Sequence, residues 1–424
     1  MNHISQCKHA IRHLWPGLTI LIFAACGMSD SESASREAPG EYEVHYTITP
    51  VPASSTVHVE LSLKQARALL RELSFAADTR IRNIKADGQV ITHGDRITWH
   101  PPATGGTLAW EAKVRSQRGK GRFDALLSAD WGIFRMEDII PRARTRTLKG
   151  AESRTSFEFS LPTAWSAITV YPSIDTPIAV DRSERRFDQP TGWIAIGDLG
   201  VRRETIAGTR VAIVAPRGED MRRMDMLALL NWTLPELAEI LPNALPRLTI
   251  VGAGDPMWRG GLSAPASFFL HAGRPLISEN ATSALLHEVM HTALGIRPRA
   301  GYDWIVEGLA EYYSIELLRR GKAVTADRAS TAMRRQHEWA EQAELLCADA
   351  STAATTALAV TILAALDREL SAATNGEAGL DDLLPGIVGR DVDLAVLTAL
   401  ASDVMGAPPD VLHIDKLPGC NSIR

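Results

Sequence analysis

Two short segments in the second half of this 424-residue chain carry the residue types and the spacing of a metal site. His287 and His291 are four residues apart, so on a helix their imidazole rings lie one above the other on one face. Glu288 lies on the flank of that face, where it can take a proton from an attacking water rather than bind a metal. Glu307, on the next amphipathic segment, is the candidate third ligand. A catalytic zinc needs three protein ligands and one open position, and this pattern supplies them.

The residues around the motif favour the helix that the site requires. Residues 280–286 are compatible with a helix, and Ser278 is the expected N-cap. Gly295 and Pro298 mark the expected end of that helix. The alternative is an amphipathic helix with two surface histidines, followed by an unrelated acidic helix.

The first 25 residues predict a secretory signal. They begin with positive charge at Lys8 and Arg12, and residues 14–25 are mostly apolar. About a dozen apolar residues are too few to span a bilayer core of about 30 Å. The junction at Cys26 resembles a bacterial lipoprotein cleavage site, so we expect a lipid on Cys26 and a flexible tether over 26–40. The alternative is ordinary signal cleavage and a soluble periplasmic protein.

The expected location of the mature protein is the bacterial cell envelope. Gly27, rather than an aspartate, follows the lipidated position, which resembles outer-membrane sorting. The protein would then be held in the membrane by its lipid and would face the periplasm. Cys347 and Cys420 are the two cysteines left in that oxidising compartment, and we expect a disulfide between them rather than a cysteine nucleophile.

Composition limits the classes of partner and the number of domains. The net charge is −5 and no basic cluster stands out, so nucleic-acid binding is not expected. A hydrophobic content of 45% over this length suits two globular domains.

The pattern of elements changes near residue 208. Residues 41–207 predict a β-sandwich-like domain, with alternating strands over 42–48, 56–61, 156–161 and 167–171. Residues 208–424 predict strands at 210–214, 248–251 and 267–270. They also predict a helix over 221–241 that breaks near Pro235, and a mostly helical remainder that includes an Ala/Thr-rich buried helix at 349–365. Strands followed by helices indicate the α+β class.

The metal motif and its surroundings resemble the gluzincin metallopeptidases, and within them the glycyl aminopeptidase family. The resemblance is carried by the zinc block 304–313 together with four supporting stretches, at 260–262, 295–298, 366–370 and 379–384. It implies a thermolysin-like zinc peptidase domain over 208–424, in which residues 260–262 belong to the substrate-binding edge strand. Relatives often carry a C-terminal PDZ domain, which we do not expect here.

The chain departs from this family at two functional positions. Ser263 stands where the family has a glutamate that holds the free amino group of the substrate. The stretch 351–357 lacks the tyrosine that steadies the oxyanion in the family. Candidates to replace that tyrosine are Tyr312, Tyr302 and His337.

These observations predict a zinc-dependent metallopeptidase that acts on a peptide or protein substrate. His287, His291 and Glu307 would bind Zn²⁺, and Glu288 would be the general base. Glu311, one helical turn after Glu307, would orient a zinc histidine through its free ring N–H. The alternative is a catalytically weak or inactive zinc-binding lipoprotein that binds peptides or proteins.

Overall fold

The computed structural model describes residues 40–171, 177–180 and 187–422. The predicted signal at 1–25, the lipidation site Cys26 and the tether up to residue 39 lie outside the described residues. None of the helices that the structure describes combines the length and the apolar character needed to cross a bilayer.

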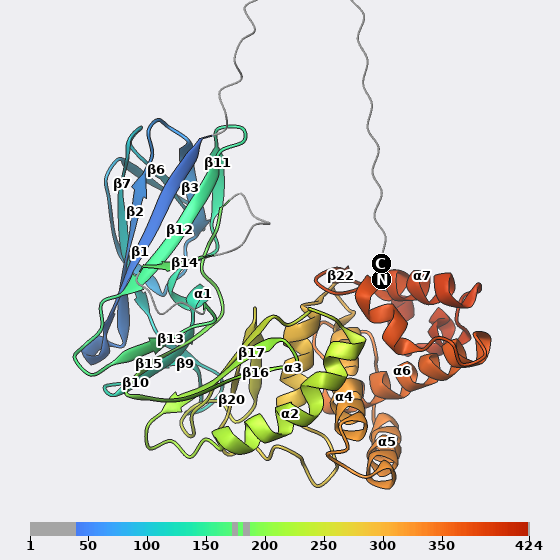
Figure 1. The fold of residues 1–424 in the computed structure, drawn as a ribbon. Coiled ribbons are helices and arrows are strands. Elements are labelled where there is room, and N and C mark those ends of the chain that lie inside the picture. Colours follow the sequence, from blue (N-terminus) through green and yellow to red (C-terminus); the bar gives the residue numbers. More distant parts are fainter. Residues whose placement is uncertain (1–39, 172–176, 181–186, 423–424) are drawn as a thin grey trace, which may run out of the picture. The chain divides into compact units, whose positions relative to one another are not determined.

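The N-terminal part of the described chain is a β-sandwich, as the alternating sequence pattern predicts (Figure 1). One sheet contains β14 (Ile178–Ala179), β12 (Glu152–Phe159), β1 (Glu41–Val51), β2 (Thr56–Lys64), β7 (Gly105–Lys113) and β4 (Ile81–Ala86), in that order. The second contains β11 (Arg144–Thr147), β3 (Leu70–Ala76), β6 (Arg96–His100) and β5 (Gln89–His93). Alternate residues of β1 and β2 are buried, and both sheets contribute to one apolar core. Within it, the rings of Phe75 and Trp110 lie 6.1 Å apart.

A third, antiparallel sheet joins the sandwich to the rest of the chain. It contains β13 (Ser166–Ile168), β15 (Trp193–Gly197), β10 (Trp131–Arg135), β9 (Phe123–Leu127) and β8 (Arg115–Gln117). The strand expected over 167–171 is therefore shorter than predicted. Trp193 anchors this sheet to the next one, because its backbone N–H donates to the Ser267 hydroxyl and its indole N–H donates to the Leu262 carbonyl.

The fourth sheet is mixed and carries the predicted edge strand. Its order is β16 (Leu199–Ile206), β17 (Thr209–Pro216), β18 (Arg247–Val251), β20 (Ser267–Leu270) and β19 (Gly261–Ala264). The three inner strands are parallel, whereas β16 and β19 are antiparallel edge strands. β16 and β17 form a hairpin across residues 207–208, where the domain boundary is expected. The boundary itself stays a prediction.

Helix α2 (Arg223–Ile240) packs on one face of the mixed sheet and passes through Pro235 without a break. The break predicted at Pro235 is therefore wrong. Leu230 and Leu234, before or next to the proline, and Leu237, after it, are buried in the same core. This shared packing outweighs the hydrogen bond that the proline removes.

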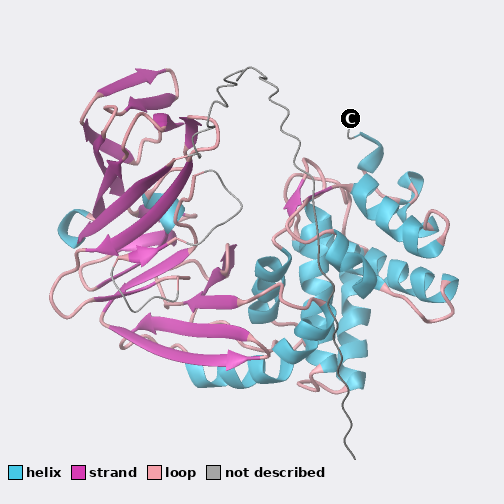
Figure 2. Cartoon of the chain, turned by 45° about the horizontal axis from the view of Figure 1, so that its top comes forward, coloured by secondary structure: helices cyan, strands magenta, loops and turns pink. Residues whose placement is uncertain are grey.

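After the mixed sheet the chain is mostly helical (Figure 2). The helices are α3 (Ala284–Leu294), α4 (Asp303–Arg320), α5 (Ala326–Ala340), α6 (Ala353–Ala373) and α7 (Leu394–Met405), with β21 (Arg297–Pro298) and β22 (Asp391–Val392) pairing in parallel. α6 covers most of the Ala/Thr-rich stretch, and the predicted helix buries one of its faces rather than its whole surface. These helices share one apolar core with α2 and the mixed sheet.

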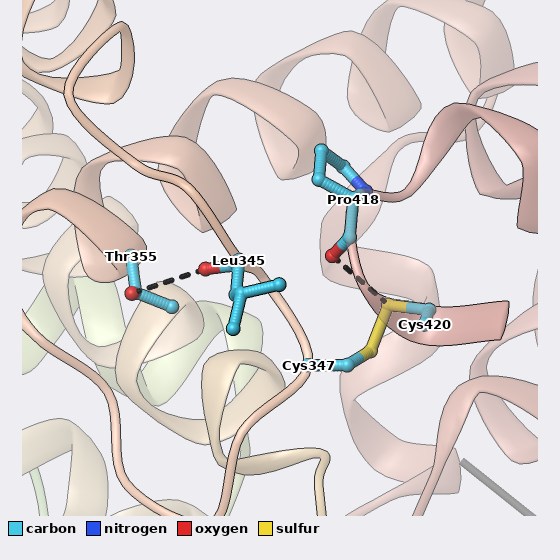
Figure 3. Close-up of a disulfide and its surroundings, with 5 residues drawn as sticks. All are labelled: Leu345, Cys347, Thr355, Pro418 and Cys420. Atoms are coloured by element: carbon cyan, nitrogen blue, oxygen red, sulfur yellow. Dashed lines mark hydrogen bonds between the residues drawn. A yellow bond between two sulfur atoms is a disulfide. The ribbon is translucent and has the colours of Figure 1, made fainter. Parts of the chain in front are cut away.

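A disulfide joins Cys347, in the loop before α6, to Cys420 near the C-terminus (Figure 3). Beside it, the backbone N–H of Leu346 donates to the carbonyl of Pro418 at 2.8 Å. The Thr355 hydroxyl of α6 donates to the Leu345 carbonyl at 3.3 Å. The disulfide and the backbone hydrogen bond thereby tie the C-terminal segment to the loop before α6, and Thr355 ties that loop to α6.

Candidate metal centre

Helix α3 presents the two histidines and has clear caps at both ends. Its N-cap is Ser283, whose hydroxyl accepts from the backbone N–H of Leu286 at 3.3 Å. Gly295 ends the helix in the left-handed conformation, as expected. The prediction of Ser278 as the N-cap is wrong, because Ser278 instead accepts from the backbone N–H of Thr282 and closes the preceding turn.

Three side chains from α3 and α4 converge on one point. His287 Nε2 lies 2.9 Å from His291 Nε2 and 3.3 Å from Glu307 Oε2, and His291 Nε2 lies 3.4 Å from Glu307 Oε1. The donor atoms of these residues all lie within 4.8 Å of one another. The structure thus brings together the three residues that the sequence predicts as metal ligands.

The donor spacing fits a tetrahedral metal ion. Ligand atoms about 2.0–2.1 Å from a zinc ion, at the corners of a tetrahedron, lie about 3.3 Å from one another. Two imidazoles and one carboxylate are also the ligand types that zinc accepts, with a fourth corner left for water or substrate.

Glu311 fixes the tautomer of His287. Its Oε2 atom lies 3.1 Å from His287 Nδ1, and a carboxylate can only accept, so Nδ1 carries the hydrogen. In the neutral form that binds a metal, the lone pair of His287 is then on Nε2, the atom that faces His291 and Glu307. Gln336, buried on α5, donates to the other oxygen of Glu311 at 3.2 Å. A chain of contacts from α5 through α4 therefore orients a ligand on α3.

The charges of the cluster favour a positive charge at its centre. Burial lowers the pKa of His287, but hydrogen bonds to Glu307 and Glu311 outweigh burial and raise it to about 10. Burial would raise the pKa of Glu307, yet the hydrogen bonds to His287 and His291 hold it well below its usual range. Without a metal, His287 keeps its proton and forms an ion pair with Glu307. A metal cation at the same place would be stabilised by the same negative charge.

Glu288 lies apart from the three donors, between α3 and the edge strand β19. It is only 7% exposed, and burial raises the pKa of its carboxyl. A Cβ atom at Gly261 would overlap the side chain of Glu288, so only glycine lets β19 run this close to the carboxylate. Glu288 is therefore positioned beside the strand along which an extended peptide can pair.

A second glycine sets the position of α4. A Cβ atom at Gly308 would lie 2.6 Å from the Cβ atom of Ala359 and 3.0 Å from Leu363 Cδ1, both on α6. The glycine next to Glu307 therefore allows α4 and α6 to pack closely. This packing holds the third donor against α3.

The two tyrosines of α4 have no hydroxyl hydrogen available for an oxyanion, so the prediction that Tyr312 donates to it is not supported. The Tyr312 hydroxyl donates to Asp367 at 3.2 Å and the Tyr313 hydroxyl to Asp381 at 2.8 Å, so neither has its hydrogen free for another acceptor. Tyr302 precedes α4 at its N-cap, and His337 is exposed on α5.

Sequence reasoning missed Gln336 and the contact of Gly261 with Glu288. Gln336 stands in a polar run of α5 that predicts only a solvated face. Its burial becomes visible only when α5 is packed beside α4. Gly261 belongs to the stretch identified by resemblance, but nothing in its sequence neighbourhood points to Glu288.

Comparison with solved structures shows which fold this is. An aminopeptidase N family protein from Idiomarina loihiensis matches with a TM-score of 0.63 and 14% identity, over 89% of this chain and 74% of that one. A mutant of an M1 zinc metallopeptidase from Deinococcus radiodurans matches with a TM-score of 0.54 and 14% identity, over 87% of this chain and 91% of that one. No family model and no curated protein matches the sequence. The predicted α+β fold, with a β-rich N-terminal part and a helical C-terminal part, is confirmed.

Proposed function

We propose that this protein is a zinc-dependent metallopeptidase that hydrolyses peptide bonds. One observation carries the proposal. The His287, His291 and Glu307 donors have tetrahedral spacing, and the buried carboxylate of Glu288, the residue after His287, lies against the edge strand β19. The likeness to M1 zinc metallopeptidases supports a peptidase fold.

The residues divide the chemistry between them. Zinc, when bound, would polarise the scissile carbonyl and lower the pKa of water. Glu288 takes a proton from the attacking water and returns it to the leaving amine. Its burial raises its pKa, which brings a carboxylate closer to the range in which it can both accept and donate a proton near neutral pH. Glu311 and Gln336 hold His287 in the tautomer that the chemistry requires.

The substrate we infer is an extended peptide cleaved within its chain. β19 has β20 on one side only, so its other edge offers backbone groups for pairing. Ser263, exposed on this strand, offers a hydroxyl and no charge for a terminal ammonium. We therefore do not carry over the aminopeptidase specificity of the glycyl aminopeptidase family.

The competing proposal is a binding protein in which zinc is structural. A structural zinc site is closed by four ligands and has no use for a buried base beside it. The described cluster has three metal donors, two imidazoles and one carboxylate, and Glu288 is a separate carboxylate outside that group. This arrangement favours the hydrolase.

Zinc stoichiometry measured together with cleavage of a mixed peptide library tests the proposal. We expect one zinc per chain, and cleavage that falls by a factor on the order of 100 or more in Glu288→Gln while zinc remains. Glu338→Gln, a substitution of the same kind at an exposed position of α5, should change neither. Full zinc in a His287→Ala/His291→Ala double variant, or full turnover in Glu288→Gln, would refute the mechanism.

For the location, we propose that a lipid on Cys26 anchors the mature protein in the outer membrane, facing the periplasm. The sequence at the junction supports this, together with the oxidising compartment that a disulfide between Cys347 and Cys420 requires.

A further inference from the structure

A cavity of about 400 Å³ lies against the mixed sheet, away from the metal donors. One wall is formed by β16, β17 and β18, and the other by residues 167–171 with Ile178. No residue of α3 or α4 lines it, so it is separate from the candidate metal centre. Its volume falls within the range typical of small-molecule sites, which is about 300–1,000 Å³.

Three arginines line the sheet side of this cavity from three neighbouring strands. Arg210 of β17 is paired in register with Arg247 of β18. Arg203 of β16 is paired with Ala212, two residues along β17 from Arg210 on the same face. The opposite face of the sheet, through Val211, packs against α2. Like charges on adjacent strands are destabilising unless an anion neutralises them.

No described carboxylate neutralises these arginines. None of Arg203, Arg210 and Arg247 has a side-chain hydrogen bond or ion pair among the described residues, whereas many other arginines of this chain do. Glu204 also borders the cavity, but its carboxylate accepts from Asn231 of α2. Arg247 places its guanidinium 5.2 Å from the centroid of the Tyr171 ring, which holds it at the cavity without supplying a negative charge.

The other wall is apolar apart from Thr169. Ile168, Val170 and Ile178 line it, together with the ring of Tyr171. Guanidinium groups bind carboxylates and phosphates through two parallel hydrogen bonds, and an aliphatic wall favours an apolar body beside them. We propose that this cavity binds an amphipathic anion, a carboxylate or phosphate attached to an aliphatic or aromatic group.

Calorimetric titration of the zinc-loaded protein at low ionic strength tests the site. The probes are octyl phosphate and octanoate, which separate the two head groups, with octanol as the neutral analogue and inorganic phosphate as the bare anion. We expect one site per chain for at least one of the two amphipathic anions. Binding of octanol and of inorganic phosphate should be at least 10-fold weaker, and added salt should weaken the amphipathic anion.

Substitutions at the arginines decide whether they form the site. Arg210→Gln and Arg247→Gln should each weaken binding by about 10-fold or more, since each removes charge-assisted hydrogen bonds. Arg202→Gln is the matched control, because it removes the same charge from β16 but alternates with Arg203 and points to the other face. Equal zinc content and equal peptide cleavage in all three variants would show that the site is independent of the metal centre.

Several outcomes would overturn this proposal. One is the absence of saturable binding for both amphipathic anions. Another is binding of octanol or inorganic phosphate that is as tight as binding of the amphipathic anions. A third is unchanged affinity for the amphipathic anions in both Arg210→Gln and Arg247→Gln. Because the readout is binding and not cleavage, a failure of the proposed peptidase activity would leave these results interpretable.

Discussion

Gly261 lies so close to Glu288 that a Cβ atom at the glycine would overlap the glutamate side chain. The edge strand that would hold a peptide and the carboxylate that would move a proton are thus set against each other. Neither residue is a metal donor, so their contact can be disturbed without removing the metal site.

Gly261→Ala should therefore lower peptide cleavage and leave zinc in place. The added methyl group pushes either Glu288 or β19 aside, and a displacement of about 1 Å at a reacting group can cost a factor on the order of 100 in rate. Cleavage rate and zinc content should be measured on the same preparation. Unchanged cleavage would show that this contact has no part in the reaction, and lost zinc would show that the helix itself had shifted.

Loss of the contacts behind His287 should weaken metal binding. We expect Glu311→Ala to lower zinc affinity by about 10- to 100-fold, because Glu311 contacts the metal ligand His287. Gln336→Leu should lower it by less, because Gln336 contacts only Glu311. Competition with a chelator of known affinity measures this. Gln342→Leu, the same substitution at an exposed position just beyond α5, is the control and should bind zinc as the parent protein does. An unchanged affinity in Glu311→Ala would contradict the orienting role.

Removal of the disulfide should destabilise the helical part. Cys347 and Cys420 are 73 residues apart, and closing a loop of this length contributes about 4 kcal/mol in the chain-entropy model. The free energy of unfolding of a Cys347→Ser/Cys420→Ser variant, measured in urea with zinc present, should fall by about this amount. Thiol labelling of the unfolded, non-reduced parent protein should find neither cysteine free, and labelling of either one would disprove the bond.

The rate of cleavage should depend little on whether the N-terminal amino group of the substrate is free. Ser263 offers only a neutral hydroxyl, and a charge-assisted hydrogen bond is roughly twice as strong as a neutral one. We expect weak or absent action on single aminoacyl reporters, and similar cleavage rates for matched peptides with free and acetylated N-termini. A Ser263→Glu variant should gain a preference for the free amine, on the order of 10-fold. A strong preference for the free amine in the parent protein would show that another group binds it.

Processing of the N-terminus should depend on Cys26. Inhibition of the lipoprotein signal peptidase should leave a larger, membrane-associated precursor, because cleavage by that enzyme requires lipid on the cysteine. The check is electrophoresis of cell fractions with and without the inhibitor. A Cys26→Ala protein that is still processed normally and stays membrane-bound would rule out the lipid anchor.

The sequence alone was enough for features that depend on near neighbours. The spacing of His287 and His291 places both rings on one face because an α-helix repeats every 3.6 residues. Alternation along 42–48 and 56–61 predicts β1 and β2 because successive side chains of a strand point to opposite faces. Gly295 ends α3 because glycine readily adopts the left-handed conformation.

Only the tertiary structure decided which distant residues meet. Glu307 was a candidate from its position after the motif, but its approach to the histidines depends on the packing of α4 against α3, helped by the space at Gly308. Gln336 reaches Glu311 from another helix, and no local pattern distinguishes it from its exposed neighbours. The unbroken helix through Pro235 was also decided by packing. Local periodicity fixes the direction of a side chain relative to its own element, whereas contacts between elements depend on how the whole core closes.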